Sequence, residues 1–367
     1  MLECGYGRGS VSRWTRRVIL SAGLAPGLWA VKGQESPGEA RKFLDGATEF
    51  EILRVTDLAH NAWLPLASNR AFTRKGDALV FASDAGGTAQ LYRHDFKANK
   101  IRQLTEAAAL NTNTFTLTAG DRGLLYVDGR KLLQTAATRD RVVYEMPEEW
   151  ARSPRIAISE DGLTVVLSSS NGTKTRIVVT GRSAMTAEER DGDIGTLYLR
   201  PGQAAVSFIA GGGLWYLPLG SKKAAVLPTA AGEVLSSLWT ADGAALLYLL
   251  KPAGTGKLTE IREIVLEGNR DSLVAKTSQF AHFQRNADAT VFLGASGSQA
   301  SPHLLLLVRS VKRELTICEH RCSDARLSRA VLSPNSARVA FQTDRHGKVV
   351  IYSMAVDRLI EQTEDNT

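Results

Sequence analysis

The chain has 367 residues, of which 44% are hydrophobic and 23% are charged. It is therefore long and apolar enough to bury a large core, and its composition is not that of a disordered protein. The formal net charge is +7, but no run of lysine and arginine is interleaved with aromatic residues, which argues against a nucleic-acid partner. The mild positive excess is compatible with a small anionic ligand.

Residues 1–30 have the layout of an export signal. Arg13, Arg16 and Arg17 form a charged region, and the apolar stretch 18–30 that follows is too short to span a bilayer. The paired arginines resemble a twin-arginine signal; a general secretory (Sec) signal and a buried first helix are the alternatives. We therefore predict a periplasmic or secreted protein with no stable membrane insertion after the signal is removed.

Residues 31–49 form a polar lead-in, with at most a short helix, to a single domain predicted over residues 50–367. A hairpin motif near the start of this domain recurs near its end, with Phe81, Asp84 and Tyr92 each repeated 260 positions later. Five weaker copies lie between them, each with three or four short apolar strands and turn residues over roughly forty residues. Seven such units predict an all-β, seven-bladed β-propeller, with six or eight blades as alternatives.

A propeller also needs a closing strand, because the last repeat contains only three clear strands. The segment 52–56 resembles the outer-strand segment 101–105 that ends the first repeat. We expect segment 52–56 to pair with the last blade as its outer strand. This pairing removes the free sheet edges at the seam of the ring.

The repeats resemble the Pro-Asp-type repeats of the TolB propeller, and the motif order over about residues 50–357 resembles the oligogalacturonate lyases. The segment 143–150, Val-Tyr-Glu-Met-Pro-Glu-Glu-Trp, is similar to a Val-Tyr-x-x-Pro-x-x-Trp segment that links blades two and three in that family. The resemblance implies a seven-bladed propeller that cleaves short pectin fragments by β-elimination. In that reaction a base removes the proton α to a uronate carboxylate, and a metal ion or an arginine stabilises the resulting anion.

The same resemblance implies a divalent metal, manganese or calcium, held by histidines and a glutamine. His282 matches one of these histidines, because Asp288 follows six residues later as the family motif requires. The stretch that corresponds to the other ligands, residues 324–330, contains no histidine and no glutamine. Asp324 and His320 are weaker candidates to complete the set, so most of the family's ligands are missing.

Arg329 stands where the last family histidine should be. Either Arg329 replaces the metal as the catalytic positive group that holds a uronate, or catalysis is lost and binding remains. Lys251 lies in a loose match to the family segment that carries the base, and it would need a depressed pKa to act as one. Residues that open the inner strands should line the axial funnel and bind substrate. These are Arg70, Arg152, Arg155 and Asn113, together with His60 from a loop ahead of the first blade.

Two functions therefore stay open from the sequence. The first is an exported, oligogalacturonate-lyase-like protein that binds acidic oligosaccharides and cleaves them if catalysis survives. The second is a non-catalytic, TolB-like propeller that acts as a sugar-binding or protein-docking platform. A monomer is expected in both cases. Cys318 and Cys322 either pair across a turn or remain separate thiols.

Overall fold

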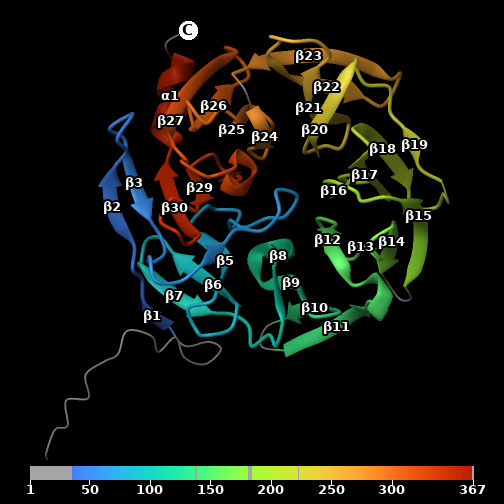
Figure 1. The fold of residues 1–367 in the computed structure, drawn as a ribbon, viewed down its shortest axis with the longest axis horizontal. Coiled ribbons are helices and arrows are strands. Elements are labelled where there is room, and N and C mark those ends of the chain that lie inside the picture. Colours follow the sequence, from blue (N-terminus) through green and yellow to red (C-terminus); the bar gives the residue numbers. More distant parts are fainter. Residues whose placement is uncertain (1–34, 137–138, 181–183, 222, 279, 366–367) are drawn as a thin grey trace, which may run out of the picture.

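The computed structural model describes residues 35–136, 139–180, 184–221, 223–278 and 280–365, so the predicted export signal lies outside the described residues. Seven β-sheets stand around a common axis (Figure 1), which confirms the predicted seven-bladed propeller. Within the described ranges, no helix is long and apolar enough to cross a membrane. The α-helix α1 (Asp357–Asp365) follows the last blade.

Each blade is a meander of four antiparallel strands, of which the first lies beside the axis and the last lies at the outer wall. Blades one to three contain β4 (Ala62–Trp63), β5 (Ala78–Ser83), β6 (Gln90–Asp95) and β7 (Lys100–Gln103); β8 (Leu110–Leu117), β9 (Gly123–Asp128), β10 (Lys131–Ala136) and β11 (Arg139–Glu145); and β12 (Arg152–Ile158), β13 (Val165–Ser170), β14 (Lys174–Thr180) and β15 (Met185–Asp191).

Blades four to six contain β16 (Leu197–Leu199), β17 (Ala205–Ala210), β18 (Gly213–Pro218) and β19 (Ala225–Val226); β20 (Gly232–Trp239), β21 (Ala245–Pro252), β22 (Thr259–Val265) and β23 (Arg270–Thr277); and β24 (Phe280–Arg285), β25 (Val291–Ser296), β26 (His303–Val308) and β27 (Arg313–Glu319). Blade seven contains β28 (Val331–Leu332), β29 (Arg338–Thr343), β30 (Val350–Ala355) and an N-terminal strand. Three short 3-10 helices lie between strands: η1 (Ala119–Asp121), η2 (Glu148–Trp150) and η3 (Ala325–Ser328).

The N-terminal strand closes the ring as the sequence predicts. β3 (Glu51–Arg54) pairs antiparallel with β30, with Leu53 opposite Ser353. The described part of the lead-in, residues 35–49, forms two strands and no helix, whereas at most a short helix was expected there. β2 (Arg41–Leu44) adds a fifth strand outside β3, and β1 (Glu35–Pro37) adds a fifth strand outside β7 of blade one. The lead-in pairs as strands because β3 and β7, the outer strands of the two blades at the seam, would otherwise leave their backbone groups unpaired.

The core lies between neighbouring blades. At the seam, one buried cluster joins Phe72 and Tyr92 of blade one to Ile351 of blade seven. A second cluster joins Ile52 of β3 to Leu306 of blade six and to apolar residues of blade seven. The seam is therefore sealed by apolar burial as well as by strand pairing.

The repeated aspartate of the hairpin motif has a structural role. Asp84 accepts hydrogen bonds from the main-chain nitrogen of Asn61 (2.7 Å) and from its side-chain amide (2.9 Å). Asp344 accepts from the main-chain nitrogen of Ser323 (2.9 Å) and from its hydroxyl. In both blades the aspartate after the second strand holds the chain that leads into the inner strand of the same blade. Propeller construction thus explains why this motif recurs.

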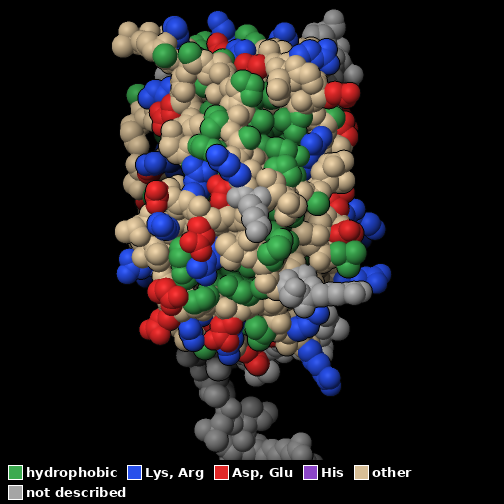
Figure 2. Space-filling view, turned by 90° about the vertical axis from the view of Figure 1, so that its right-hand side faces the viewer, with side chains coloured by type: hydrophobic (Ala, Val, Ile, Leu, Met, Phe, Trp, Pro, Cys, Tyr) green, Lys and Arg blue, Asp and Glu red, His purple; other side chains and the backbone are tan. Residues whose placement is uncertain are grey.

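The outer wall carries charges of both signs. Figure 2 shows the side of the ring around β15 and β19, where lysine and arginine side chains lie among aspartates and glutamates. One such pair is Arg176 with Glu189, at 2.8 Å. Exposed pairs of this kind contribute little to stability. The mixed charges on this face do not favour a polyanion over a polycation.

The two cysteines of the described residues, Cys318 and Cys322, are buried and unpaired. They are therefore separate thiols, which is one of the two alternatives left open by the sequence. Burial raises the pKa of Cys322 to about 12, and it also raises the pKa of Cys318. Both thiols are thus protonated and poor nucleophiles near neutral pH.

Candidate functional site

All inner strands begin at the same end of the ring. Because each blade is a four-stranded antiparallel meander, the outer strand ends on the side where the inner strand began. The next inner strand therefore starts on that side again. We call this end of the axial channel the start mouth and the opposite end the end mouth.

Four inner strands are irregular near the start mouth. Their register with the second strand shifts at these positions: between Leu110 and Phe115 in β8, Arg152 and Arg155 in β12, Val234 and Ser236 in β20, and Phe280 and His282 in β24. Irregularities of this kind re-aim side chains and are frequent beside functional sites. Because four blades have such an irregularity near the same end of the channel, we take the start mouth as the candidate site.

Residues 64–70 form a loop at the centre of the ring, which we call the central loop. This segment leaves blade one after β4 and reaches into the centre of the ring (Figure 1). The main-chain nitrogen of Leu66 donates to the carbonyl of Asn113 on blade two (3.0 Å), and the side-chain amide of Gln284 on blade six donates to the carbonyl of Ala67. No pattern in the sequence predicted this loop over residues 64–70.

Arg329 and Asn113 meet at the start mouth. Nη1 of Arg329 donates to Oδ1 of Asn113 (2.7 Å) and to the carbonyl of Leu64 (2.8 Å). Arg329 follows η3 directly and has left-handed backbone angles, φ 39° and ψ 41°. A non-glycine residue in this region is strained, and such strain tends to occur at functional sites. The surrounding contacts therefore hold Arg329 in a conformation that it would not favour by itself.

Arg155 approaches Arg329 from blade three, which stands across the ring from blade seven. Nε of Arg155 donates to the carbonyl of Ile194 (3.0 Å). Burial lowers the pKa of Arg329, and the neighbouring positive charge of Arg155 lowers it further. Burial also lowers the pKa of Arg155. Both groups stay charged near neutral pH, because arginine starts from a very high pKa. Guanidinium groups from blades three and seven thus lie near enough to repel each other.

Both guanidinium groups keep donors for a ligand. Within the described ranges, the hydrogen bonds account for Nε of Arg155 and Nη1 of Arg329, and neither arginine has a carboxylate within 4 Å. A guanidinium presents five N–H donors in a planar fork that matches a carboxylate. The amide nitrogen of Asn113 adds a neutral donor beside them. This arrangement is suited to binding a carboxylate.

The other predicted substrate-binding residues lie elsewhere. Arg152 is exposed, and its guanidinium lies against the turn at Gly172, between the second and third strands of blade three and away from the axis. Arg70 lies at the end mouth, where it donates to the carboxylate of Asp121 and to the carbonyl of Thr118 (2.6 Å). Arg70 follows the central loop and lines the end-mouth cavity, whereas we expected it to line the same funnel as Arg155 and Arg329.

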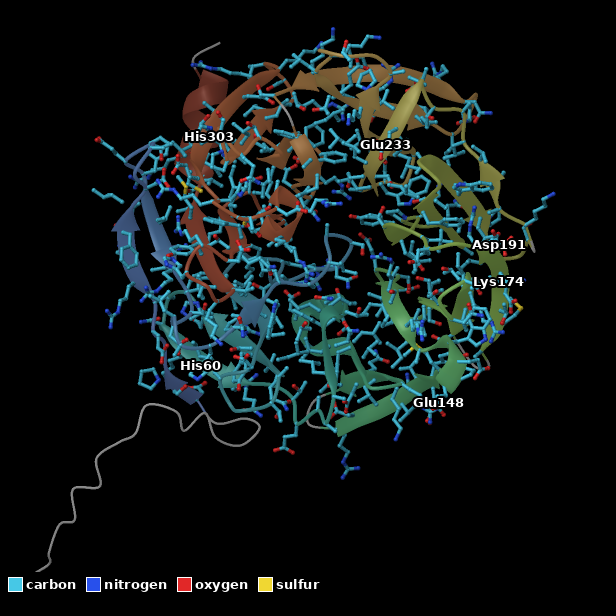
Figure 3. All side chains as sticks on the ribbon, in the orientation of Figure 1. His60, Glu148, Lys174, Asp191, Glu233 and His303 are labelled. Atoms are coloured by element: carbon cyan, nitrogen blue, oxygen red, sulfur yellow. The ribbon has the colours of Figure 1, made fainter. Side chains whose placement is uncertain are left out.

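His60 does not reach the axis. It lies over blade one, away from the centre of the ring (Figure 3). Its Nδ1 is 2.9 Å from Oδ2 of Asp57, and its main-chain nitrogen donates to Oδ1 of the same residue (3.0 Å). Asp57 thus holds His60 as part of the chain that enters blade one, which is a structural contact.

Lys251, the candidate base, is exposed near the end of β21 and lies opposite Glu233 of β20. Since β21 is the second strand of blade five, Lys251 is one strand away from the axis. Within the described ranges, no hydrogen bond or ion pair joins it to Arg155, Arg329 or Asn113. The structure does not bring Lys251 together with the arginine pair.

The two histidines of the predicted metal set have other partners. Nε2 of His282 lies 2.9 Å from Oγ of Ser328, in hydrogen-bonding distance. Nε2 of the buried His320 lies 3.1 Å from the carbonyl of Ser296, and its Nδ1 accepts from the main-chain nitrogen of Cys322 (3.0 Å). Both ring nitrogens of His320 are therefore occupied, and neither is free to bind a metal.

The third candidate ligand is occupied as well. Asp324 caps η3 by accepting from the main-chain nitrogen of Arg326 (2.8 Å), and it forms an ion pair with the same side chain (2.7 Å). Among the residues that the structure describes, no group of three histidine, cysteine, aspartate or glutamate side chains is placed to hold an ion. A transition metal needs several free donors converging on one point. The residues present do not fit the metal of the lyase family.

The end mouth opens into a cavity of about 660 Å³, which the sequence did not predict. Arg70 and Arg285 are part of its wall. Arg285 donates through Nε to the carbonyl of Trp239 (2.6 Å) and through Nη1 to the carbonyl of Asn286 (2.7 Å). Arg70 is neutralised by Asp121, and most donors of Arg285 are taken by carbonyls. The third arginine of the wall, Arg74, is exposed, and an exposed charge attracts a carboxylate less than a half-buried one does.

Comparison with known proteins agrees with this fold. The family model of oligogalacturonate lyase matches residues 30–168. An oligogalacturonate lyase solved in complex with manganese is 19% identical, with a TM-score of 0.81 over 90% of this chain and 100% of that one. An oligogalacturonate lyase from Vibrio parahaemolyticus is 20% identical, with a TM-score of 0.80 and the same coverage. Comparison with curated protein sequences gives no match.

Proposed function

Because the chain resembles the oligogalacturonate lyase family in its propeller fold and over residues 30–168, we propose that it binds an acidic (uronate) oligosaccharide at the start mouth. The observation that carries this proposal is the repulsion between Arg155 and Arg329, neither of which has a carboxylate within 4 Å in the described ranges; Asp193 acts on Arg155 only from beyond that distance. Two half-buried positive charges that repel each other are costly unless an anion lies beside them. A ligand carboxylate supplies that anion.

The geometry also suggests how the ligand is held. The free guanidinium donors of Arg155 and Arg329 form charge-assisted hydrogen bonds to the two carboxylate oxygens, and Asn113 donates to a neighbouring hydroxyl or ring oxygen. Because both arginines are partly desolvated, the attraction exceeds that of an exposed ion pair. The carboxylate also relieves the repulsion between the two guanidinium groups.

Cleavage by β-elimination makes a further demand on the site. Arg155 and Arg329 can stabilise the negative charge that develops on the uronate carboxylate. The reaction also needs a base within hydrogen-bond reach of the α proton. Lys251, the base suggested by the family resemblance, is not joined to the arginine pair. We therefore propose carboxylate binding as the function that the site supports best, and turnover as a separate question. We prefer ligand binding to a protein-docking platform, since Arg155 lies on the inner strand β12 and Arg329 bonds Asn113 of the inner strand β8, and neither lies on the outer wall.

Calorimetric titration of the wild-type protein with trigalacturonate tests the proposal. We expect binding at low ionic strength that weakens as salt is added, because salt screens charge–charge attraction. Maltotriose, a neutral trisaccharide, is the matched ligand and should not bind. Equal binding of both sugars, or no binding of the acidic one, would refute carboxylate recognition. Ultraviolet absorbance of the unsaturated product, followed in the same samples, reports any cleavage.

We also propose that residues 1–30 direct the protein out of the cytoplasm, to the periplasm or the medium. The support is the charged region with Arg16 and Arg17 followed by a short apolar stretch. In a bacterial host with both export routes, fractionation should recover the protein outside the cytoplasm. Replacing Arg16 and Arg17 by lysine keeps the charge and should block only the twin-arginine route. Wild-type protein that stays in the cytoplasm would contradict export.

A further inference from the structure

We infer that the three candidate metal ligands, His282, His320 and Asp324, serve instead as a scaffold that presents Arg329, so that ligand binding at the start mouth needs no divalent cation. His282 is then a positioning residue that acts through Ser328. This inference rests on the proposed function of the site.

The contacts of His282 support this role. His282 lies on β24 of blade six, and its Nε2 reaches Oγ of Ser328, which is fully buried. Ser328 is the last residue of η3, and the next residue is Arg329. The hydrogen bond therefore fixes the chain one residue before the strained left-handed position. Since the arginine side chain leaves the backbone at that position, its direction depends on this anchor.

The other end of η3 is fixed by Asp324. Its carboxylate caps the helix and is neutralised by the guanidinium of Arg326. The chain before the helix is tied to blade six by His320, which bonds the carbonyl of Ser296. Each of the three candidate metal ligands thus forms hydrogen bonds or an ion pair that hold residues 320–328 in place. Together these contacts over-determine the backbone, which is the condition for keeping a strained residue.

The charge of His282 agrees with this interpretation. Burial, with a smaller contribution from His320, lowers the pKa of His282 to about 4. The ring is therefore neutral at neutral pH and adds no positive charge beside the arginine pair. The positive charge of the site comes from Arg155 and Arg329, which stand in for a cation as permanent charges.

A double-mutant cycle tests the positioning role. His282→Ala and Ser328→Ala are each expected to weaken trigalacturonate binding by about 3- to 10-fold, the size of one lost hydrogen bond. The double variant should be no weaker than either single variant, because both changes break the same contact. His282→Gln, which keeps a polar group at this position, should recover part of the affinity. His303→Ala, on the same blade but in contact with Glu319, is the matched control and should bind as the wild type does. Additive losses in the cycle would overturn the positioning role.

Metal dependence is measured on the same proteins. The affinity of the wild type for trigalacturonate should not change between a chelator and added manganese. Manganese without sugar should leave the melting temperature unchanged. If manganese raised the melting temperature of the wild type and not of His282→Ala, His282 would be a metal ligand and the inference would be wrong. This measurement needs no sugar, so it decides whether His282 binds a metal even if the wild type binds no trigalacturonate and the proposed function fails.

Discussion

Replacing Arg155 and Arg329 together by glutamine should weaken trigalacturonate binding by about 100-fold or more. A hydrogen bond to a charged group contributes about 1.5–3 kcal/mol, and the double variant removes two charged donors that face one ligand carboxylate. Glutamine keeps a polar amide of moderate size, so the change removes charge more than it removes volume. Isothermal titration calorimetry at low ionic strength measures the difference directly.

Arg152→Gln is the matched control for this experiment. It removes the same charge from the start of the same inner strand as Arg155, but its side chain is exposed and points away from the axis. Its affinity should stay within about twofold of the wild type, since exposed charges act weakly at a distance. If Arg152→Gln lost as much affinity as the double variant, net charge and not the axial pair would hold the ligand. Circular dichroism of each variant checks that the fold is retained.

The fold was predictable because a propeller repeats its own construction. The 260-residue offset between Phe81 and Phe341 reflects two hairpins with the same register and the same aspartate contact to the incoming chain. The closing strand was predictable because a four-stranded sheet cannot end on three strands without leaving an open edge. The extra strands β1 and β2 were missed, because their short and mostly polar sequences carry no strand periodicity.

The site was only partly predictable. Arg155, Arg329 and Asn113 were chosen because they open inner strands, and the structure brings these three together. The same reasoning failed for Arg70, because the loop over residues 64–70 is inserted into the inner strand of blade one and leaves Arg70 on its end-mouth side. It also failed for Arg152, since a bulge between it and Arg155 breaks the alternation of side chains. Bulges and inserted loops depend on tertiary contacts, such as that of Leu66 with blade two, which the sequence does not show.

Residue type alone did not show whether the candidate metal ligands are free to bind an ion. Residue type made His320 and Asp324 reasonable ligands, because imidazole and carboxylate groups bind divalent ions. What each group does depends on its neighbours. The ring nitrogens of His320 are hydrogen-bonded to Ser296 and Cys322, and the carboxylate of Asp324 is paired with Arg326. The sequence alone could not supply these partners, except for the local N-cap pattern of Asp324 ahead of η3.

Truncating the chain before residue 55 should lower the melting temperature by about 10 °C or more. This truncation removes β3, which pairs with β30 and buries Ile52 in the cluster that joins blades six and seven. Burying an isoleucine contributes about 1.5–3 kcal/mol, and each ladder hydrogen bond contributes about 0.5–1.5 kcal/mol. Each kcal/mol moves the melting temperature by about 2–4 °C in domains of 150–250 residues, and by about 2 °C in a larger domain such as this one. Scanning calorimetry gives the value.

Truncation before residue 45 provides the comparison that isolates the closing strand. It removes β1 and β2 but keeps β3, and all four residues of β2 are exposed, so the melting temperature should fall by only a few degrees. If the longer truncation does not give soluble protein, Ile52→Asp in the full chain makes the same test by placing an unpaired charge in the cluster. Equal melting temperatures for the two truncations would mean that the ring is held at the seam by residues 55–64 and not by β3. Both truncated proteins keep one such contact, because the main-chain nitrogen of Val55 donates to the carbonyl of Ile351 on blade seven (2.8 Å).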